Sequence, residues 1–150
     1  MKFALAISTS IEIRKQAFFM SEFSNNLEEY FKDKHYGSDL EEIIIGIICV
    51  SPQFEQFFEP ISPKYIKNNK IIKSVYTEKS YQIEKCLSYD IKLDFNLFIN
   101  IDDSSRKKLL ALNLLDSLII IDSMKSKIKD FDSEKFKEDL ESYFREKELI

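Results

Sequence analysis

The apolar positions divide the chain into strand-like and helix-like segments. Residues 2–8 alternate, with large apolar side chains at the odd positions and alanines between them, which predicts a strand packed on both faces. Thr9 and Glu12 then have the spacing of a capping box, in which each side chain satisfies a backbone N–H at a helix start. The pattern therefore predicts that an opening strand leads directly into a helix.

That first helix is predicted over residues 11–34, because apolar residues recur there at helical spacing. Gly37 follows at a point where a helix C-terminus often needs a residue in the left-handed conformation. The predicted apolar stripe comprises Ile13, Ala17, Met20, Phe23, Leu27, Tyr30 and Phe31.

The middle of the chain is rich in strand-like segments. Residues 40–50 show no alternation in their apolar part, which is typical of a central strand covered on both faces. Gly46 inside this strand indicates a bulge or a closely packed neighbour. Residues 71–76 and 81–86 are predicted to form a hairpin, and residues 88–95 alternate like an antiparallel strand with one wet side.

Two helices are predicted in the last third of the chain. The first covers residues 104–124 after an aspartate cap, Asp102 or Asp103, and its apolar character on nearly every side indicates a buried central helix. The second begins after Asp132 as its N-cap, ends near residue 147 and is amphipathic.

The resulting element order is β-α-β-β-β-β-α-α. Strands gathered in the middle of a chain favour an α+β fold, with an antiparallel or mixed sheet packed against a long N-terminal helix and two C-terminal helices. The chain has 150 residues, of which 44% are hydrophobic, and a domain of this size builds a core without a metal or disulfide. We therefore expect a single domain over residues 1–150.

Charge and cysteine usage narrow the class of protein. A net charge of −4 argues against general nucleic-acid binding, where a basic surface supplies most of the affinity. The longest apolar runs, residues 43–50 and 109–121, are shorter than the roughly 20 residues that span a bilayer, and residues 1–10 lack a signal-peptide pattern. Cys49 and Cys86 lie in apolar strands, as reduced core cysteines do. The sequence therefore favours a cytoplasmic protein that does not bind membranes.

Signals for catalysis are sparse, and we expect neither an enzyme nor a bound cofactor. His35 is the single histidine and stands at the predicted helix end, where an imidazole interacts favourably with the helix dipole. One histidine and two separated cysteines do not supply a zinc site, and two glycines do not form a phosphate-binding loop. The acidic pairs that would need a cleft to act as acid and base are Glu41–Glu42, Asp90–Asp94 and Asp102–Asp103.

The charges are segregated along the chain. Residues 19–42 hold seven acids against two lysines, whereas residues 64–85 hold six lysines against two acids. Acidic surfaces can speed association with a basic partner, although a solvated helix face is often acidic without such a role. Aromatic residues in a Pro-flanked segment can anchor an interface or pack over the core. The candidate interface residues are Glu28, Glu29, Asp33, Asp39, Glu41, Phe54, Phe57 and Phe58.

The order of segments across nearly the whole chain resembles one of the immunity-protein families of bacterial polymorphic toxin and contact-dependent inhibition systems, the family numbered forty-four. The residues that carry the resemblance are, in chain order, Ser8, Thr9 and Glu12 before the long helix, Tyr36-Gly37 and Leu40-Glu41-Glu42 before an Ile-rich strand, Tyr89-Asp90-Ile91-Lys92-Leu93-Asp94-Phe95 after a Lys-rich hairpin, then Leu114-Leu115-Asp116-Ser117-Leu118, and finally Phe131-Asp132.

The resemblance implies a non-catalytic protein that binds and neutralises a cognate toxin domain inside the producing cell. Many such toxins are nucleases with basic clefts, which an acidic surface would suit. The alternative is a structural or regulatory module of a larger assembly, with a homo-oligomer left open. A large exposed apolar patch would favour that alternative.

Overall fold

The computed structural model describes residues 1–8, 17–50, 64–66, 71–73, 80–82 and 85–150. Residues 9–16 and the segment 51–63, which holds the candidate anchors Phe54, Phe57 and Phe58, lie outside these ranges. The elements are β1 (Lys2–Ser8), α2 (Ala17–Phe31), β2 (Glu42–Val50), β3 (Lys64–Ile66), β4 (Ile71–Lys73), β5 (Ser80–Gln82), β6 (Cys86–Asp94), α3 (Phe95–Ile99), α4 (Asp103–Asp116), α5 (Leu118–Met124) and α6 (Ser133–Glu146).

A four-stranded mixed sheet, in the order β1-β2-β6-β3, forms the base of the fold. β1 pairs parallel to β2, with Lys2 opposite Glu42, and β2 pairs parallel to β6, with Glu42 opposite Cys86. Among the described strands of this sheet, β3 alone runs antiparallel, beside the beginning of β6. β4 and β5 form a separate antiparallel hairpin.

The α+β class and the mixed sheet are thus confirmed, whereas antiparallel pairing, the other arrangement expected, is wrong for β1, β2 and β6. Residues 88–94 of the strand predicted over 88–95 belong to β6, which lies inside the sheet between β2 and β3, and Phe95 begins α3. Its polar positions Asp90 and Lys92 are half-buried. Alternation reports how each face is covered and carries no information on the direction of the neighbouring strand, so the parallel arrangement could not be read from it.

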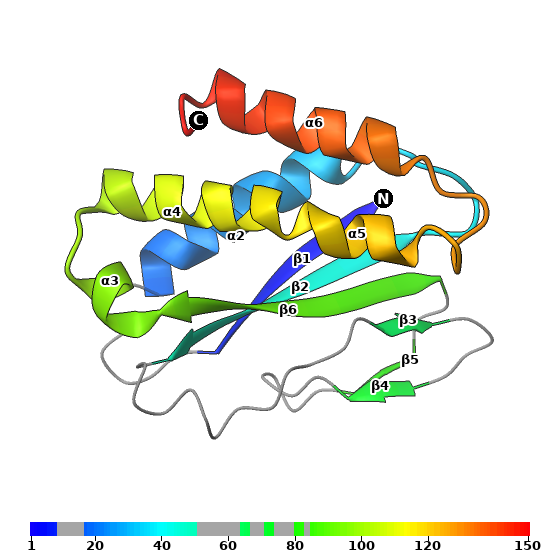
Figure 1. Ribbon diagram of the computed structural model, residues 1–150, viewed down its shortest axis with the longest axis horizontal. Coiled ribbons are helices and arrows are strands. Elements are labelled where there is room, and N and C mark those ends of the chain that lie inside the picture. Colours follow the sequence, from blue (N-terminus) through cyan, green and yellow to red (C-terminus); the bar gives the residue numbers. More distant parts are fainter. Residues whose placement is uncertain (9–16, 51–63, 67–70, 74–79, 83–84) are drawn as a thin grey trace.

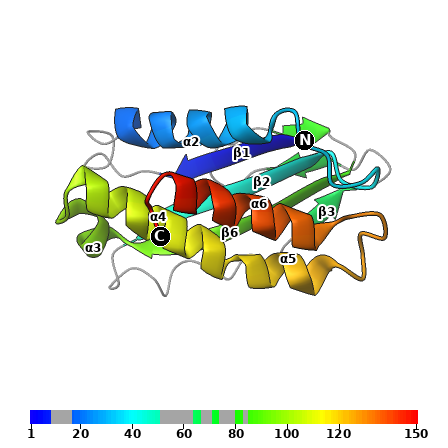
Figure 2. The same cartoon turned by 90° about the horizontal axis from the view of Figure 1, so that it is seen from above.

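The described helices lie on one face of the sheet (Figure 1). Viewed from above, α2 runs along the β1 side, α4 and α5 run along the β6 side, and α6 lies between them (Figure 2). Rings join α6 to α2, with the centroids of Tyr30 and Tyr143 4.7 Å apart and those of Phe23 and Phe144 6.2 Å apart. The core therefore lies between one helical layer and one face of the sheet.

The β2 strand is buried on both faces, as its sequence predicts. Ile43, Ile45 and Ile47 belong to the core beneath the helices. Ile44 and Ile48 alternate with them and are also buried, so the opposite face is covered as well. The ladders to β1 and β6 continue through Gly46 without interruption, which excludes the expected bulge.

The first helix is shorter in the described residues than the predicted range 11–34, because α2 ends at Phe31. Its buried residues Phe23, Leu27 and Phe31 follow the predicted stripe. Gly37 does have a positive φ of 116°, but it stands six residues beyond the helix end. It shapes a loop and does not cap α2.

The predicted helix over 104–124 is two helices, α4 and α5, interrupted at Ser117. The Ser117 hydroxyl donates to the carbonyl of Leu114 at 2.6 Å and lies 3.0 Å from the Tyr89 hydroxyl. A serine that bonds to the preceding helical turn competes with the helix backbone, which accounts for the interruption. The two expected C-terminal helices are therefore three.

The α4–α5 pair is also not the buried central helix that its composition indicated. Its inner side buries Leu110, Leu114 and Ile121, but Leu112 and Ile119 are 52% and 73% exposed on the outer side. The sheet lies beneath these helices (Figure 1), and the side of them that carries Leu112 and Ile119 faces solvent. Within the described residues, no helix combines the length and apolar character needed to cross a membrane.

Aspartates begin the last helices, as predicted. Asp102 accepts a hydrogen bond from the N–H of Ser105 at 2.8 Å, and Asp132 accepts one from the N–H of Lys135 at 3.1 Å. The first of these bonds holds the pKa of Asp102 below its usual value. Asp94 caps α3 in the same way, so it serves the helix start and not the wet face of a strand.

Candidate functional site

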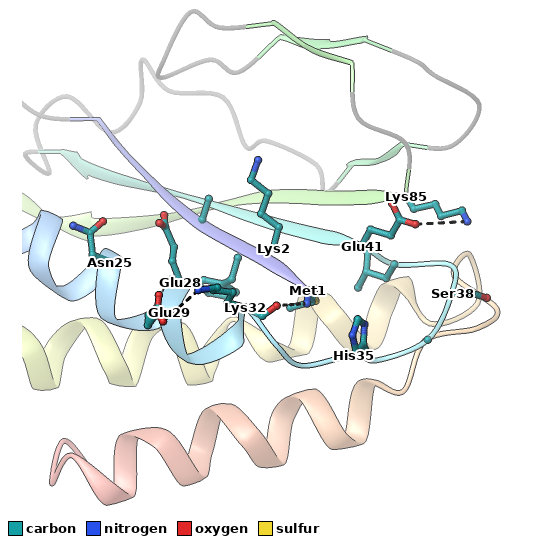
Figure 3. Close-up of a pocket in the computed structure, with 14 residues that line it drawn as sticks. Met1, Lys2, Asn25, Glu28, Glu29, Lys32, His35, Ser38, Glu41 and Lys85 are labelled. Atoms are coloured by element: carbon teal, nitrogen blue, oxygen red, sulfur yellow. Dashed lines mark hydrogen bonds and ion pairs between the residues drawn. The ribbon is translucent and has the colours of Figure 1, made fainter.

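A pocket of about 870 Å³ lies at the outer edge of β1, between α2 and the loop of residues 32–41 (Figure 3). Residues 1–4 form its floor, and Asn25, Glu28 and Glu29 come from α2. The loop contributes His35 and Glu41, and Lys85 closes the end nearest β6. Within the described residues, this pocket is the site where most of the predicted interface residues come together.

The position of β1 in the sheet creates the open side of the pocket. Among the described strands, β1 has a neighbour on one edge only. The N–H of Lys2 donates to the carbonyl of Glu41 at 2.9 Å, so the backbone groups of Lys2 point towards β2. In a parallel ladder the next residue presents its N–H and C=O to the other side. The backbone groups of Phe3 and Leu5 therefore face the pocket edge.

The α2 wall is acidic because the opposite side of the helix is committed to the core. Leu27 and Phe31 are fully buried, which turns Glu28 and Glu29 outward. Glu29 forms an exposed ion pair with Lys32 at 3.6 Å. Glu28 accepts a long hydrogen bond of 3.5 Å from Ser24, and none of the ion pairs between described side chains includes it. Figure 3 shows the Glu28 side chain rising from α2 towards β1.

A clasp between two loops holds the far wall of the pocket, and we name it the 38–130 clasp. The N–H of Ser38 donates to the Asp130 carboxylate at 2.7 Å, and the Ser38 hydroxyl donates to the same oxygen. The N–H of Asp39 donates to the carbonyl of Asp130, and the N–H of Asp130 donates to the Asp39 carboxylate, each at 3.2 Å. Hydrogen bonds from Ser38 lower the pKa of Asp130. The loop that carries Glu41 is thereby tied to the segment before α6.

Gly37 fits against the clasp because it has no side chain. A Cβ atom at this position would lie 2.3 Å from the carbonyl oxygen of Asp130. Next to it, the buried Tyr36 hydroxyl donates to the Asp139 carboxylate of α6 at 2.6 Å. Burial, followed by this bond to Asp139, raises the pKa of Tyr36. The loop is therefore fixed to the helical layer at two adjacent points.

The Met1 amine sits at the C-terminal end of α2. It donates to the carbonyls of Phe31 and Lys32, each at 3.3 Å, and to that of Lys34. A positive group is favourable where helix carbonyls lack partners. Desolvation nevertheless lowers the pKa of this amine, and nearby Asp33 partly opposes the shift. β1 is in this way tied to α2 at the pocket floor.

The candidate interface residues have different places in the structure. Glu28, Glu29 and Glu41 all line the pocket. Asp33 is exposed beside it, and Asp39 takes part in the 38–130 clasp. Phe54, Phe57 and Phe58 lie outside the described residues. The structure thus gathers three of the predicted acids and assigns a fourth to loop packing.

Lysines pair with two of the pocket acids, Glu29 and Glu41, a feature that sequence reasoning missed. Lys2, Lys32 and Lys85 line the same pocket, and Lys85 lies 3.9 Å from Glu41. In Figure 3 the Lys2 side chain points to the side of β1 away from α2. The cations come from three distant parts of the chain, so charge counts along the sequence could not show that they meet the acids here.

The acidic pairs considered for acid–base chemistry do not form shared sites. Glu41 is exposed in the pocket, whereas Glu42 is 3% exposed and points to the other side of the strand. One Glu42 carboxylate oxygen is buried without a hydrogen-bond partner among the residues that the structure describes. Desolvation raises the pKa of Glu42, partly offset by Lys2. Asp94 and Asp102 cap helices, as described above.

The cysteines are free and buried, as expected. Burial raises the pKa of Cys49 to about 11 and that of Cys86 to about 12, so both thiols are protonated at neutral pH. His35 stands apart from them, exposed in the pocket loop. Within the described ranges, no group of three or more histidine, cysteine or acidic side chains could hold a metal ion. The pocket is suited to polar and ionic contacts with a partner.

Comparison with known proteins agrees with the family resemblance that the order of segments indicates. The family model described as immunity protein 44 matches residues 1–146. No curated protein matches the chain, and no solved structure matches it. The match covers β1, the β1-edge pocket and every described helix through α6. The chain therefore belongs to the immunity protein 44 family.

Proposed function

We propose that this protein is a non-catalytic immunity protein that binds a cognate toxin domain and neutralises it in a stoichiometric complex. The match of residues 1–146 to the immunity protein 44 family carries this proposal. The cytoplasm of the producing cell is the compartment in which such protection is needed. A toxin nuclease, whose own substrate site is basic, is one candidate partner.

We assign the toxin-binding surface to the pocket at the β1 edge. Three of the expected acids meet there, and the 38–130 clasp together with the Met1 amine holds its walls in place. A rigid, preformed surface loses little conformational freedom on binding, which favours affinity. Acidic side chains at its rim increase the rate of encounter with a basic partner.

Co-expression tests the proposed function. The C-terminal domain encoded by the gene immediately upstream is expressed alone and together with this protein, and growth is scored. We expect the domain alone to arrest growth, and co-expression to restore growth and yield a one-to-one complex on purification. A domain that is harmless alone, or equally toxic with and without this protein, would contradict the proposal.

The alternative, a module of a larger assembly, is supported by the outer surface of α4 and α5. Leu112 and Ile119 are 52% and 73% exposed, and a contiguous apolar patch built on these two side chains would mark a contact between subunits. Sedimentation of the wild type and of the double variant Leu112→Ser, Ile119→Ser separates the two functions. A wild-type oligomer that the double variant converts to monomer would favour the module.

A further inference from the structure

We propose that the toxin contributes an extended, basic segment that adds as a further strand to the open edge of β1. The inference rests on the proposed function and deepens it, because it specifies the chemistry of the partner segment and its mode of binding. Addition of a strand to a sheet edge is a common way for a domain to recognise an extended peptide.

The first support is the state of the β1 edge. β1 pairs with β2 on one side, and the ladder there uses the backbone groups of Lys2 and Ala4. The N–H and C=O groups of Phe3 and Leu5 point the other way, to the open side of the strand, and Phe3 lines the pocket there. Proteins usually cover, shorten or charge an exposed edge, since it is a template for pairing with another chain. Here the edge is bordered by a pocket that leaves space along residues 1–4.

The second support is the chemistry of the walls. A strand placed beside β1 would run along the α2 wall, beneath Asn25, Glu28 and Glu29. Glu28 reaches towards β1 and is without an ion pair among the described residues. Lys2 is directed to the other side of the strand, so it does not neutralise Glu28. Lysine or arginine side chains of the added segment would therefore find a partner in Glu28.

A second copy of this chain fits the edge less well. Two copies joined through β1 would bring their Glu28 and Glu29 side chains to the same junction, where like charges repel. The basic segment of a different protein instead gains from these acids. The charge of the α2 wall therefore favours the toxin as the occupant.

Hydrogen exchange provides a direct test, with the upstream-encoded domain as the probe. In the free protein we expect fast exchange at the amides of Phe3 and Leu5, because both face the open edge. In the complex both amides should become protected. Ala4 supplies an internal control, since its N–H points to β2 and should be protected in both states.

A matched pair of variants tests the same bonds by affinity. Leu5→Pro and Leu5→Ala both remove the half-buried side chain, but only the proline removes the outward N–H. Proline is tolerated at an edge position whose N–H faces outward. We expect both variants to fold, and the proline variant to bind the domain about tenfold more weakly than the alanine variant.

Two charge substitutions on α2 test the contribution of Glu28 to binding. Glu28→Lys should weaken binding, whereas Glu22→Lys makes the same charge change at an exposed position outside the pocket and should not.

If the wild-type complex forms but the Phe3 and Leu5 amides still exchange rapidly and the paired variants bind alike, strand addition is wrong and the proposed function stands. If no complex forms, both fail. Concentration-dependent protection of these amides in the free protein would instead assign the edge to a second copy.

Discussion

At two positions, the surrounding structure imposes a free-energy cost on the folded state. Gly37 has a positive φ, which residues with a side chain rarely adopt, and its backbone packs closely against Asp130. Glu42 carries a buried carboxyl group on a central strand, and one of its oxygens has no hydrogen-bond partner within the described part of the chain. Glu42 lies outside the pocket, and Gly37 lines it without a side chain, so the effect of changing either residue should be seen in stability.

Replacing Gly37 with alanine should lower the free energy of unfolding by about 2 kcal/mol or more, because the new methyl group meets a backbone oxygen and the left-handed conformation is strained. Urea denaturation of the variant measures the loss. His35→Ala, an exposed change in the same loop, should shift stability by less than about 0.5 kcal/mol. Equal stability of the Gly37 variant and the wild type would contradict the packing of Gly37 against Asp130.

Glu42→Gln should make stability less dependent on pH. The pKa of Glu42 is raised, so the folded state holds this proton more tightly than the unfolded state. In the wild type, this group therefore destabilises the fold as the pH rises above its ordinary value of 4.5. We expect the glutamine variant to be more stable than the wild type at pH 8, with a smaller difference at pH 5.

Urea denaturation at the two pH values measures this difference. Glu41→Gln changes the neighbouring exposed carboxylate and serves as the control. A Glu42 variant that is less stable than the wild type at pH 8 would show that the charged carboxylate is stabilised in the fold.

At the scale of elements, the sequence predicts the amphipathic parts well and the direction of the strands poorly. α6 is amphipathic, as predicted, and buries Phe136, Leu140 and Phe144, and the buried face of α2 follows its predicted stripe. Periodicity and caps act within a few residues, so a local pattern contains them. The parallel pairing of β1 with β2 depends on how α2 crosses the sheet, which no local pattern records.

The break between α4 and α5 is a further case in which a distant residue decides local structure. Tyr89 of β6 is buried, and burial raises its pKa. Because the Ser117 hydroxyl donates to Leu114, the Tyr89 hydroxyl donates to Ser117. The continuous apolar run in the sequence does not reveal this hydrogen-bonded pair, and the pattern therefore predicts a single long helix.

A double-mutant cycle should expose this pair. We expect Ser117→Ala to lower the free energy of unfolding by about 1–3 kcal/mol, since it leaves a buried phenol without a partner. In a Tyr89→Phe background the same substitution should cost about 1 kcal/mol less. Urea denaturation of the four proteins gives the coupling energy, and additive effects would exclude the hydrogen bond as a stabilising contact.

At the scale of the whole molecule, the candidate site joins segments that are far apart in the chain. The acids of α2 and Glu41 could be selected from charge segregation, and the structure places them together. The position of β1 at the edge of the sheet could not be predicted from the sequence, because it depends on how all the strands of the sheet pair. Lys85 likewise reaches the pocket only because β6 returns beside β2.

Charge reversal over the acidic wall tests this arrangement at long range. Glu28→Lys, Glu29→Lys and Asp33→Lys together should slow association with the toxin domain by about tenfold at low salt, with the far-ultraviolet circular dichroism unchanged. Stopped-flow mixing measures the rate. The triple variant Glu138→Lys, Glu146→Lys, Glu148→Lys changes net charge equally on α6 and beyond it, away from the pocket. Equal slowing in both variants would mean that net charge, and not the wall, governs encounter.

The parallel sheet also governs how quickly the protein reaches its native state after synthesis. Each central pairing, β1 with β2 and β2 with β6, joins segments roughly 40 residues apart. Neither pairing gains stability until a long loop has closed, so the topology belongs to the slower class of folding reactions. Under the proposed function, a cell that starts to make the toxin and this protein together would be protected only once this sheet has closed. The folding time of this protein would then set the minimum delay before protection.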